Sequence, residues 1–160
     1  MNIYLIRHGE AEPTSENKPH EMRGLTENGI KTVQASAEFW KNFIQIFDII
    51  LSSPLKRAIQ TAQLIRDVLE VKQKVMEEIS LLNGGITEDL LSIAEAFGMN
   101  EIAMVGHQPD IGIHISAMTG AGDSNFKIPP ATIAKIHFRD NPRSGKGILE
   151  FLLPPISKKG

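Results

Sequence analysis

The sequence predicts an α/β fold, a three-layer α/β/α sandwich around a mostly parallel central sheet. Short apolar segments alternate with longer segments in which apolar residues recur every three or four positions, and this alternation is typical of strands followed by helices. Several of the apolar segments end in glycine, serine or proline, which mark turns. A chain of 160 residues suffices for one compact core, so we expect a single domain over residues 1–160.

In the first half of the chain, residues 2–6 are the first predicted strand and residues 9–24 an ordered loop. A helix capped by Thr26 follows. Residues 48–51 are the second strand, and the Ser53-Pro54 pair supplies the N-cap and first residue of a second helix. Apolar positions at helical spacing give the buried faces of the two helices: Ile30, Val33, Ala37, Trp40 and Ile44, then Leu55, Ala58, Ala62, Ile65 and Leu69.

The second half continues the alternation. Its elements are a short strand at 75–79, a helix at 88–97, a strand at 102–105, a helix from Pro109 to Met118, and strands at 132–138 and 147–153. Gly98 ends the first of these helices, and Pro109 opens the second. The last two strands enclose a turn-like segment and are expected to form an edge pair, and residues 158–160 a frayed tail.

Composition excludes several classes of function. The net charge of −2 and the pI near 6.2 give no basic field for nucleic acid or an anionic membrane, so neither is an expected partner. Without cysteine, the chain has no disulfide and no thiol nucleophile, and a metal site would need histidine and carboxylate alone. No segment approaches the roughly 18 apolar residues of a membrane span. We therefore expect a soluble, cytoplasmic protein.

Three predicted strands end in residues suited to phosphate chemistry. Because ligands bind at the carboxyl ends of parallel strands, the groups that follow these strands should converge. A neutral imidazole can attack phosphorus, and guanidinium groups bind phosphate oxygens with two parallel hydrogen bonds. The predicted catalytic residues are His8, Arg7, Arg57 and His107, and the predicted phosphate- or substrate-binding residues are Gly9, Ser52, Glu10 and Gly106.

Two of these assignments have a local geometric reason. Gly9 lacks a side chain, so backbone and phosphate could approach closely beside His8. Arg57 lies one turn into the second helix, and helical side chains lean toward the N-terminus, where the helix dipole favours anions. Ser52 could donate through its hydroxyl group, whereas Ser53 is explained by capping alone. His114 and His137 are interpreted as structural.

Four segments together show a family resemblance. They are residues 5–10 (Leu-Ile-Arg-His-Gly-Glu), 25–29 (Leu-Thr-Glu-Asn-Gly), 52–62 (Ser-Ser-Pro-Leu-Lys-Arg-Ala-Ile-Gln-Thr-Ala) and 105–109 (Val-Gly-His-Gln-Pro). Their order and spacing resemble the histidine phosphatase superfamily, formerly named for phosphoglycerate mutase. The resemblance implies that His8 is phosphorylated, that Arg7, Arg57 and His107 form the phosphate pocket, and that no metal or organic cofactor takes part.

Within that superfamily, the short chain and the Glu10-Ala11 pair resemble the SixA-type phosphohistidine phosphatases. In that subgroup the implied substrate is a phosphohistidine on a signalling protein. The chain has little room for a lid, and an open site suits a protein substrate. Larger members carry a glutamate general acid in an insertion that has no clear match here. The proton donor is therefore unassigned, with Glu10, His20, Glu21 and Glu78 as candidates, although His20 otherwise reads as an ordinary loop histidine.

Three alternatives stay open at this point. One is a small-molecule phosphomonoesterase or a mutase of the same superfamily, which would share the mechanism. A second is a phosphate-binding module without turnover, because no general acid is visible. A third is a metallohydrolase that uses His8, His107 and carboxylates such as Glu10 or Asp110, although the flanking arginines would repel a cation.

Overall fold

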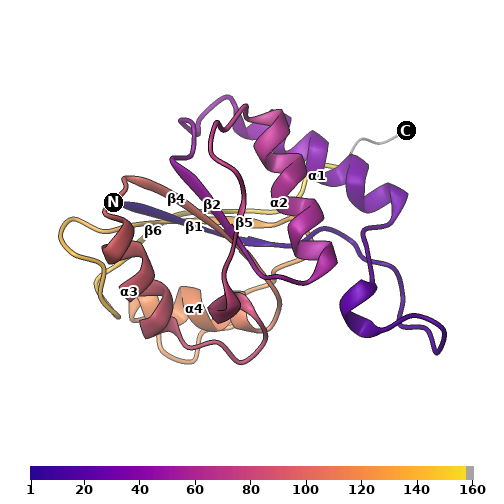
Figure 1. Cartoon of the computed structure of the whole chain (residues 1–160). Helices are drawn as coiled ribbons and strands as arrows, with labels where there is room; N and C mark the ends of the chain where they lie inside the picture. Colours follow the sequence, from indigo (N-terminus) through magenta and orange to yellow (C-terminus); the bar gives the residue numbers. More distant parts are fainter. Residues whose placement is uncertain (158–160) are drawn as a thin grey trace.

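The computed structural model, which describes residues 1–157, is a three-layer α/β/α arrangement (Figure 1). The strands are β1 (Asn2–Arg7), β2 (Ile49–Ser52), β3 (Met76–Glu77), β4 (Glu101–Gly106), β5 (Ile133–His137) and β6 (Ile148–Leu153). The helices are α1 (Glu27–Trp40), α2 (Lys56–Val68), α3 (Thr87–Phe97) and α4 (Asp110–Thr119), with short 3₁₀ helices η1 (His20–Met22) and η2 (Ile79–Leu81). The predicted fold class is confirmed, and the 158–160 tail lies outside the described residues.

The six strands form one sheet in the order β3-β2-β4-β1-β5-β6. Pairing is parallel among β1, β2, β3 and β4, and antiparallel where β5 meets β1 and β6. The register pairs Arg7 with Gly106 and Ser52 with Val105. Because these strands run in one direction and end at matched positions, the residues that follow them come together at one edge of the sheet.

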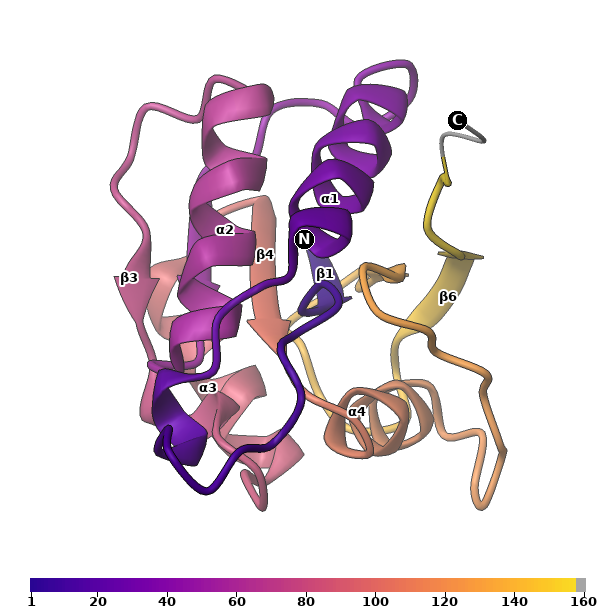
Figure 2. The same ribbon diagram turned by 90° about the vertical axis from the view of Figure 1, so that its right-hand side faces the viewer.

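Each face of the sheet is covered by two helices. In Figures 1 and 2, α1 and α2 lie above the sheet and α3 and α4 below it. One core cluster joins side chains of α1 and α2, including Val33 and Ile65, to one sheet face. The other joins side chains of α3 and α4, including Leu90 and Ile115, to the opposite face. The helices are thereby fixed to the sheet, and their ends hold the residues that surround its carboxyl edge.

Helix boundaries follow the predicted capping residues, with one exception. The Thr26 side chain accepts the amide hydrogen of Gly29, and Gly98 ends α3 in a left-handed conformation. However, α2 begins at Lys56, with Leu55 as its N-cap, so the prediction that Ser53 and Pro54 open this helix is wrong. The amide of Ser53 instead donates to the carbonyl of Val105, which prolongs the sheet by one residue.

The two late strands agree with the prediction, whereas the short middle strand is shorter than predicted. β5 and β6 form the expected antiparallel pair at one edge of the sheet, where β5 also pairs with β1 and β6 is the outer strand. The strand predicted at 75–79 is limited to the two residues of β3, after which the chain turns into η2. Within residues 1–157, no helix is long and apolar enough to cross a membrane.

Candidate active site

The carboxyl edge of the sheet brings together the groups that follow β1, β2 and β4. His8 comes directly after β1 and His107 directly after β4, and their ring centroids are 5.1 Å apart. The pKa of each histidine is lowered by the charges of two arginines. These are Arg57, the second residue of α2, and Arg7, the last residue of β1. The four residues predicted as catalytic therefore lie within electrostatic reach of one another.

His8 is held as a neutral imidazole with one free nitrogen. Its side chain is only 8% exposed, and Nδ1 lies 2.7 Å from the carbonyl oxygen of Gly9. A carbonyl can only accept, so Nδ1 carries the hydrogen and Nε2 keeps its lone pair. Burial lowers the pKa of His8 to about 4; the hydrogen bond to Gly9 opposes this shift, and the charge of Arg57 adds to it. Nε2 is consequently an unprotonated nucleophile at neutral pH.

His107 is oriented by Ser53. Its Nε2 lies 2.7 Å from the Ser53 hydroxyl, whereas its buried Nδ1 has no partner in the described structure. If Nε2 carried the hydrogen, both the Ser53 hydroxyl hydrogen and Nδ1 would lack partners. If Ser53 donates to Nε2, the only unpaired group is an Nδ1–H donor. Burial, reinforced by the charges of His8 and Arg57, lowers the pKa of His107 to about 3.

The guanidinium groups of Arg57 and Arg7 are anchored by loops. Arg57 is 3% exposed; its Nη1 donates to the carbonyl of His20 (3.2 Å), and its Nη2 lies 2.9 Å from the His20 ring. Arg7 donates from Nη1 to the carbonyl of Ile128 (2.7 Å), and its buried Nε has no partner. Burial lowers the pKa of both groups. Neither forms a salt bridge within residues 1–157.

The unpaired polar groups define what the pocket can bind. Arg7 Nε and the Nδ1 of His107 are buried donors without acceptors, and leaving such groups unpaired costs about 1–3 kcal/mol each. An oxyanion that reached both groups would supply the acceptors that they lack. The arrangement therefore suits a tetrahedral phosphoryl group held by cationic and neutral donors and attacked by an imidazole nitrogen.

The glycines of the site serve packing. A Cβ atom on Gly9 would lie 2.6 Å from Cγ2 of Val33, so α1 fills the space that we predicted for an approaching phosphate. That reason for Gly9 is wrong, because its missing side chain admits α1 instead. Gly106 accepts the amide hydrogen of His8 through its carbonyl (3.0 Å), which fixes the backbone at the nucleophile.

The side chains of Ser52 and Glu10 are directed elsewhere. The hydroxyl of Ser52 is fully buried and donates to the carbonyl of Ser53 (2.8 Å). The carboxylate of Glu10 accepts from Thr26 Oγ1 (2.7 Å) and Asn28 Nδ2 (3.1 Å), at the start of α1. The structure thus contradicts direct phosphate contact by the Ser52 hydroxyl and places the Glu10 carboxylate away from His8.

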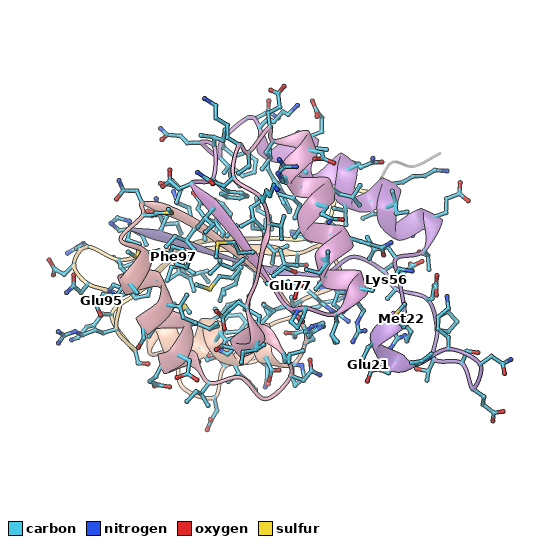
Figure 3. All side chains as sticks on the ribbon, in the orientation of Figure 1. Glu21, Met22, Lys56, Glu77, Glu95 and Phe97 are labelled. Atoms are coloured by element: carbon cyan, nitrogen blue, oxygen red, sulfur yellow. The ribbon has the colours of Figure 1, made fainter. Side chains whose placement is uncertain are left out.

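The other candidates for the proton donor are also occupied or peripheral. Glu78 accepts the amide hydrogen of Ser80 (2.9 Å). Glu21 is exposed on η1, and its charge raises the pKa of Arg57 against the larger effect of burial. Figure 3 shows Glu21 and Met22 on the same side of the molecule as Lys56 at the start of α2. The described residues contain no cluster of three or more metal-ligating side chains.

Three residues contribute to the site in ways that the sequence does not predict: Ser53, His20 and Arg23. The sequence predicts a capping role for Ser53 and an ordinary loop position for His20, and it gives no signal for Arg23. Arg23 nevertheless lowers the pKa of both His8 and Arg57. The Ser53 contact could have been inferred from the matched ends of β2 and β4. The loop that carries His20 and Arg23 has no periodicity that would reveal its path.

Comparisons with known proteins place the chain in a family. The sequence matches the Histidine phosphatase superfamily (branch 1) over residues 3–96. It is 28% identical over 151 residues to the phosphohistidine phosphatase SixA homolog of Haemophilus influenzae, covering 88% of this chain and 90% of the relative. It is 23% identical over 162 residues to phosphohistidine phosphatase SixA of Escherichia coli, covering 99% and 97%. A solved structure of the protein histidine phosphatase SixA complexed with tungstate has a TM-score of 0.85 at 22% identity, covering 96% of this chain and 97% of that one.

The matched residues make up more than half of the chain, which therefore belongs to branch 1 of the histidine phosphatase superfamily. They include Arg7, His8 and Arg57, while His107 lies beyond them. Within this family the chain is a SixA-like phosphatase, similar to SixA proteins along nearly its whole length in sequence and fold.

Proposed function

We propose that the chain hydrolyses phosphohistidine on a signalling protein through a covalent phosphohistidine intermediate on His8. Its similarity to relatives named as phosphohistidine phosphatases supports this substrate class. The observation that carries the proposal is the set of arginines and histidines around an unprotonated His8 Nε2. The charges that shift the pKa of His8 all belong to arginines, and those that shift the pKa of His107 belong to arginines and histidines.

The reaction proceeds in two displacements. The lone pair of His8 Nε2 attacks phosphorus, the bond between phosphorus and the substrate imidazole breaks, and the leaving nitrogen takes up a proton. Water then attacks phosphorus, the Nε2–P bond breaks, and inorganic phosphate leaves with His8 neutral again. Over the cycle, water supplies the oxygen gained by phosphate and the proton gained by the substrate. Throughout, Nδ1–H remains bonded to the Gly9 carbonyl, which stabilises the charge on the phosphorylated ring.

The basic pocket favours a nitrogen leaving group over an oxygen one. A departing alkoxide needs a proton from an acid, a contribution of about 10²–10⁴ in rate. The carboxylates of Glu10 and Glu78 are engaged with Thr26 and the Ser80 amide, so neither is presented to a leaving group. Glu21 is exposed on η1, and no hydrogen bond within residues 1–157 positions its carboxylate. A phosphoramidate nitrogen is more basic than an ester oxygen and leaves readily once solvent has protonated it. Phosphohistidine is therefore the substrate that this pocket should hydrolyse fastest.

The test is a comparison of two substrates on one enzyme preparation. We expect kcat/KM for a phosphohistidine peptide to exceed that for a phosphoserine peptide, whose leaving group is an alkoxide, by about a hundredfold, the factor that a missing acid imposes on the ester. His8→Ala should hydrolyse neither. Faster hydrolysis of the phosphate ester would replace the proposal with a phosphomonoesterase. Phosphate binding without hydrolysis of either substrate would replace it with a binding module.

A further inference from the structure

His20 places one imidazole ring between two guanidinium groups. Its Nε2 lies 2.9 Å from Nη2 of Arg57, and its Nδ1 lies 3.2 Å from Nη1 of Arg23. Its carbonyl also accepts from Arg57 Nη1 (3.2 Å) and from the amide of Arg23 (3.3 Å). This arrangement joins the buried phosphate-binding arginine to a more exposed one through a single ring at the surface.

The hydrogen-bonding capacity of the ring cannot satisfy both arginines. Guanidinium nitrogens only donate, and a neutral imidazole has one acceptor and one N–H. If Nε2 of His20 accepts from Arg57, Nδ1 carries its hydrogen and faces an N–H of Arg23. Two donors then point into the same gap at 3.2 Å. A protonated ring has no acceptor at all, which makes the conflict worse, whereas an anionic oxygen beside the two nitrogens would accept from both groups.

The charge of Arg23 is also uncompensated. Its Nε donates to the backbone carbonyl of Glu12 (2.7 Å), while the Glu12 carboxylate is paired with Lys18. Arg23 forms no salt bridge in the part of the chain that the structure describes. Its charge reaches the phosphate pocket, because it lowers the pKa of His8 and Arg57. The outer arginine is thus a cation near the pocket without an acidic partner.

We propose that His20 and Arg23 form an outer anion subsite that binds a second acidic group, carried by the substrate beside the transferred phosphoryl group. The inference rests on the proposed function, since it assumes that Arg57 holds the transferred phosphoryl group. It specifies the substrate further: the phosphorylated residue has a carboxylate or another anion next to it. A substrate without that anion leaves the two donors facing each other and binds more weakly.

The test uses two phosphonates that cannot be hydrolysed and that differ in one group. Phosphonoacetate carries a carboxylate beside the phosphonate, and ethylphosphonate carries a methyl group there. We expect phosphonoacetate to bind the native chain about tenfold more tightly by calorimetry, the effect of one charge-assisted interaction. Arg23→Gln should abolish this preference, and Arg23→Lys, which keeps the charge but not the fork, should reduce it. Lys18→Gln removes a charge from the same loop and should preserve it.

The outcomes separate the subsite from the proposed function. Equal binding of the two phosphonates to the native chain, or a preference that survives Arg23→Gln, would overturn the subsite. Unchanged ethylphosphonate binding by Arg23→Gln shows that the variant is folded and its phosphate pocket intact. A preference that depends on Arg23, in a protein that hydrolyses no phosphohistidine peptide, would support the subsite and overturn the proposed function alone.

Discussion

Ser53→Ala tests the assignment of His107 as a donor to phosphate. The hydrogen bond from Ser53 to His107 spans 2.7 Å between side chains that are 0% and 3% exposed, so water cannot readily replace the lost hydroxyl. A buried polar atom left without its partner costs about 1–3 kcal/mol. If that cost falls on the transition state, kcat/KM drops by a factor of about 5–150. The loss follows because nothing then holds the hydrogen of His107 on Nδ1.

Ser52→Ala is the matched control. Its hydroxyl is equally buried but donates to the carbonyl of Ser53 and does not contact His107. Both variants should lose about 1 kcal/mol of unfolding free energy in urea titrations, whereas only Ser53→Ala should lose activity on a phosphohistidine peptide. ¹⁵N NMR should find His107 as the Nδ1–H tautomer in the native chain and as a mixture in Ser53→Ala. An Nε2–H tautomer in the native chain, or equal losses of activity in the two variants, would refute the reasoning.

Further predictions follow from the same geometry. Because its lowered pKa keeps His8 neutral above about pH 4, kcat/KM should fall only near that pH; an acid limb centred near 6.5 would contradict this. Between about pH 6.5 and 4 the unfolded chain binds more protons than the folded chain, because the pKa of His8 is lowered on folding. The unfolding free energy should therefore decrease as the pH is lowered from about 6.5 to 4, and an unfolding free energy from urea titrations that stays constant over this range would count against it. Gly9→Ala should cost about 1–3 kcal/mol through its clash with Val33, and Val33→Ala should relieve it; equal costs in both backgrounds would disprove the clash. Arg57→Lys should lower kcat/KM about 10–100-fold, because lysine lacks the two parallel N–H donors of the guanidinium group. Lys56→Arg, at the neighbouring exposed position, should leave kcat/KM within about twofold. Similar kcat/KM values for the two variants would refute phosphate binding by Arg57.

The fold was predictable because its signals are local. Helical spacing, the Thr26 cap and the Gly98 stop each act within a few residues, and all three occur where expected. The start of α2 could not be predicted in the same way, because the residues of a Ser-Ser-Pro sequence are typical of helix caps whether or not a helix begins there. Only the pairing of β2 with β4 shows that the Ser53 amide belongs to the sheet.

The site was predictable only where strand ends define it. His8 and His107 meet because β1 and β4 end in register. Proximity in the sequence misled elsewhere: Glu10 is two residues from His8, yet its carboxylate binds at the start of α1. The position of His20 depends on how a long loop folds back onto Arg57, and no pattern in the sequence encodes that path.

The most direct test of the central claim is to trap the phosphoenzyme. The native chain and His8→Ala would be quenched at alkaline pH during turnover of a phosphohistidine peptide and analysed by mass spectrometry and ³¹P NMR. The account predicts one phosphoryl group on Nε2 of His8, because Nδ1–H is held by the Gly9 carbonyl, and none in the variant. Phosphorylation at Nδ1, or turnover that persists in His8→Ala, would contradict it.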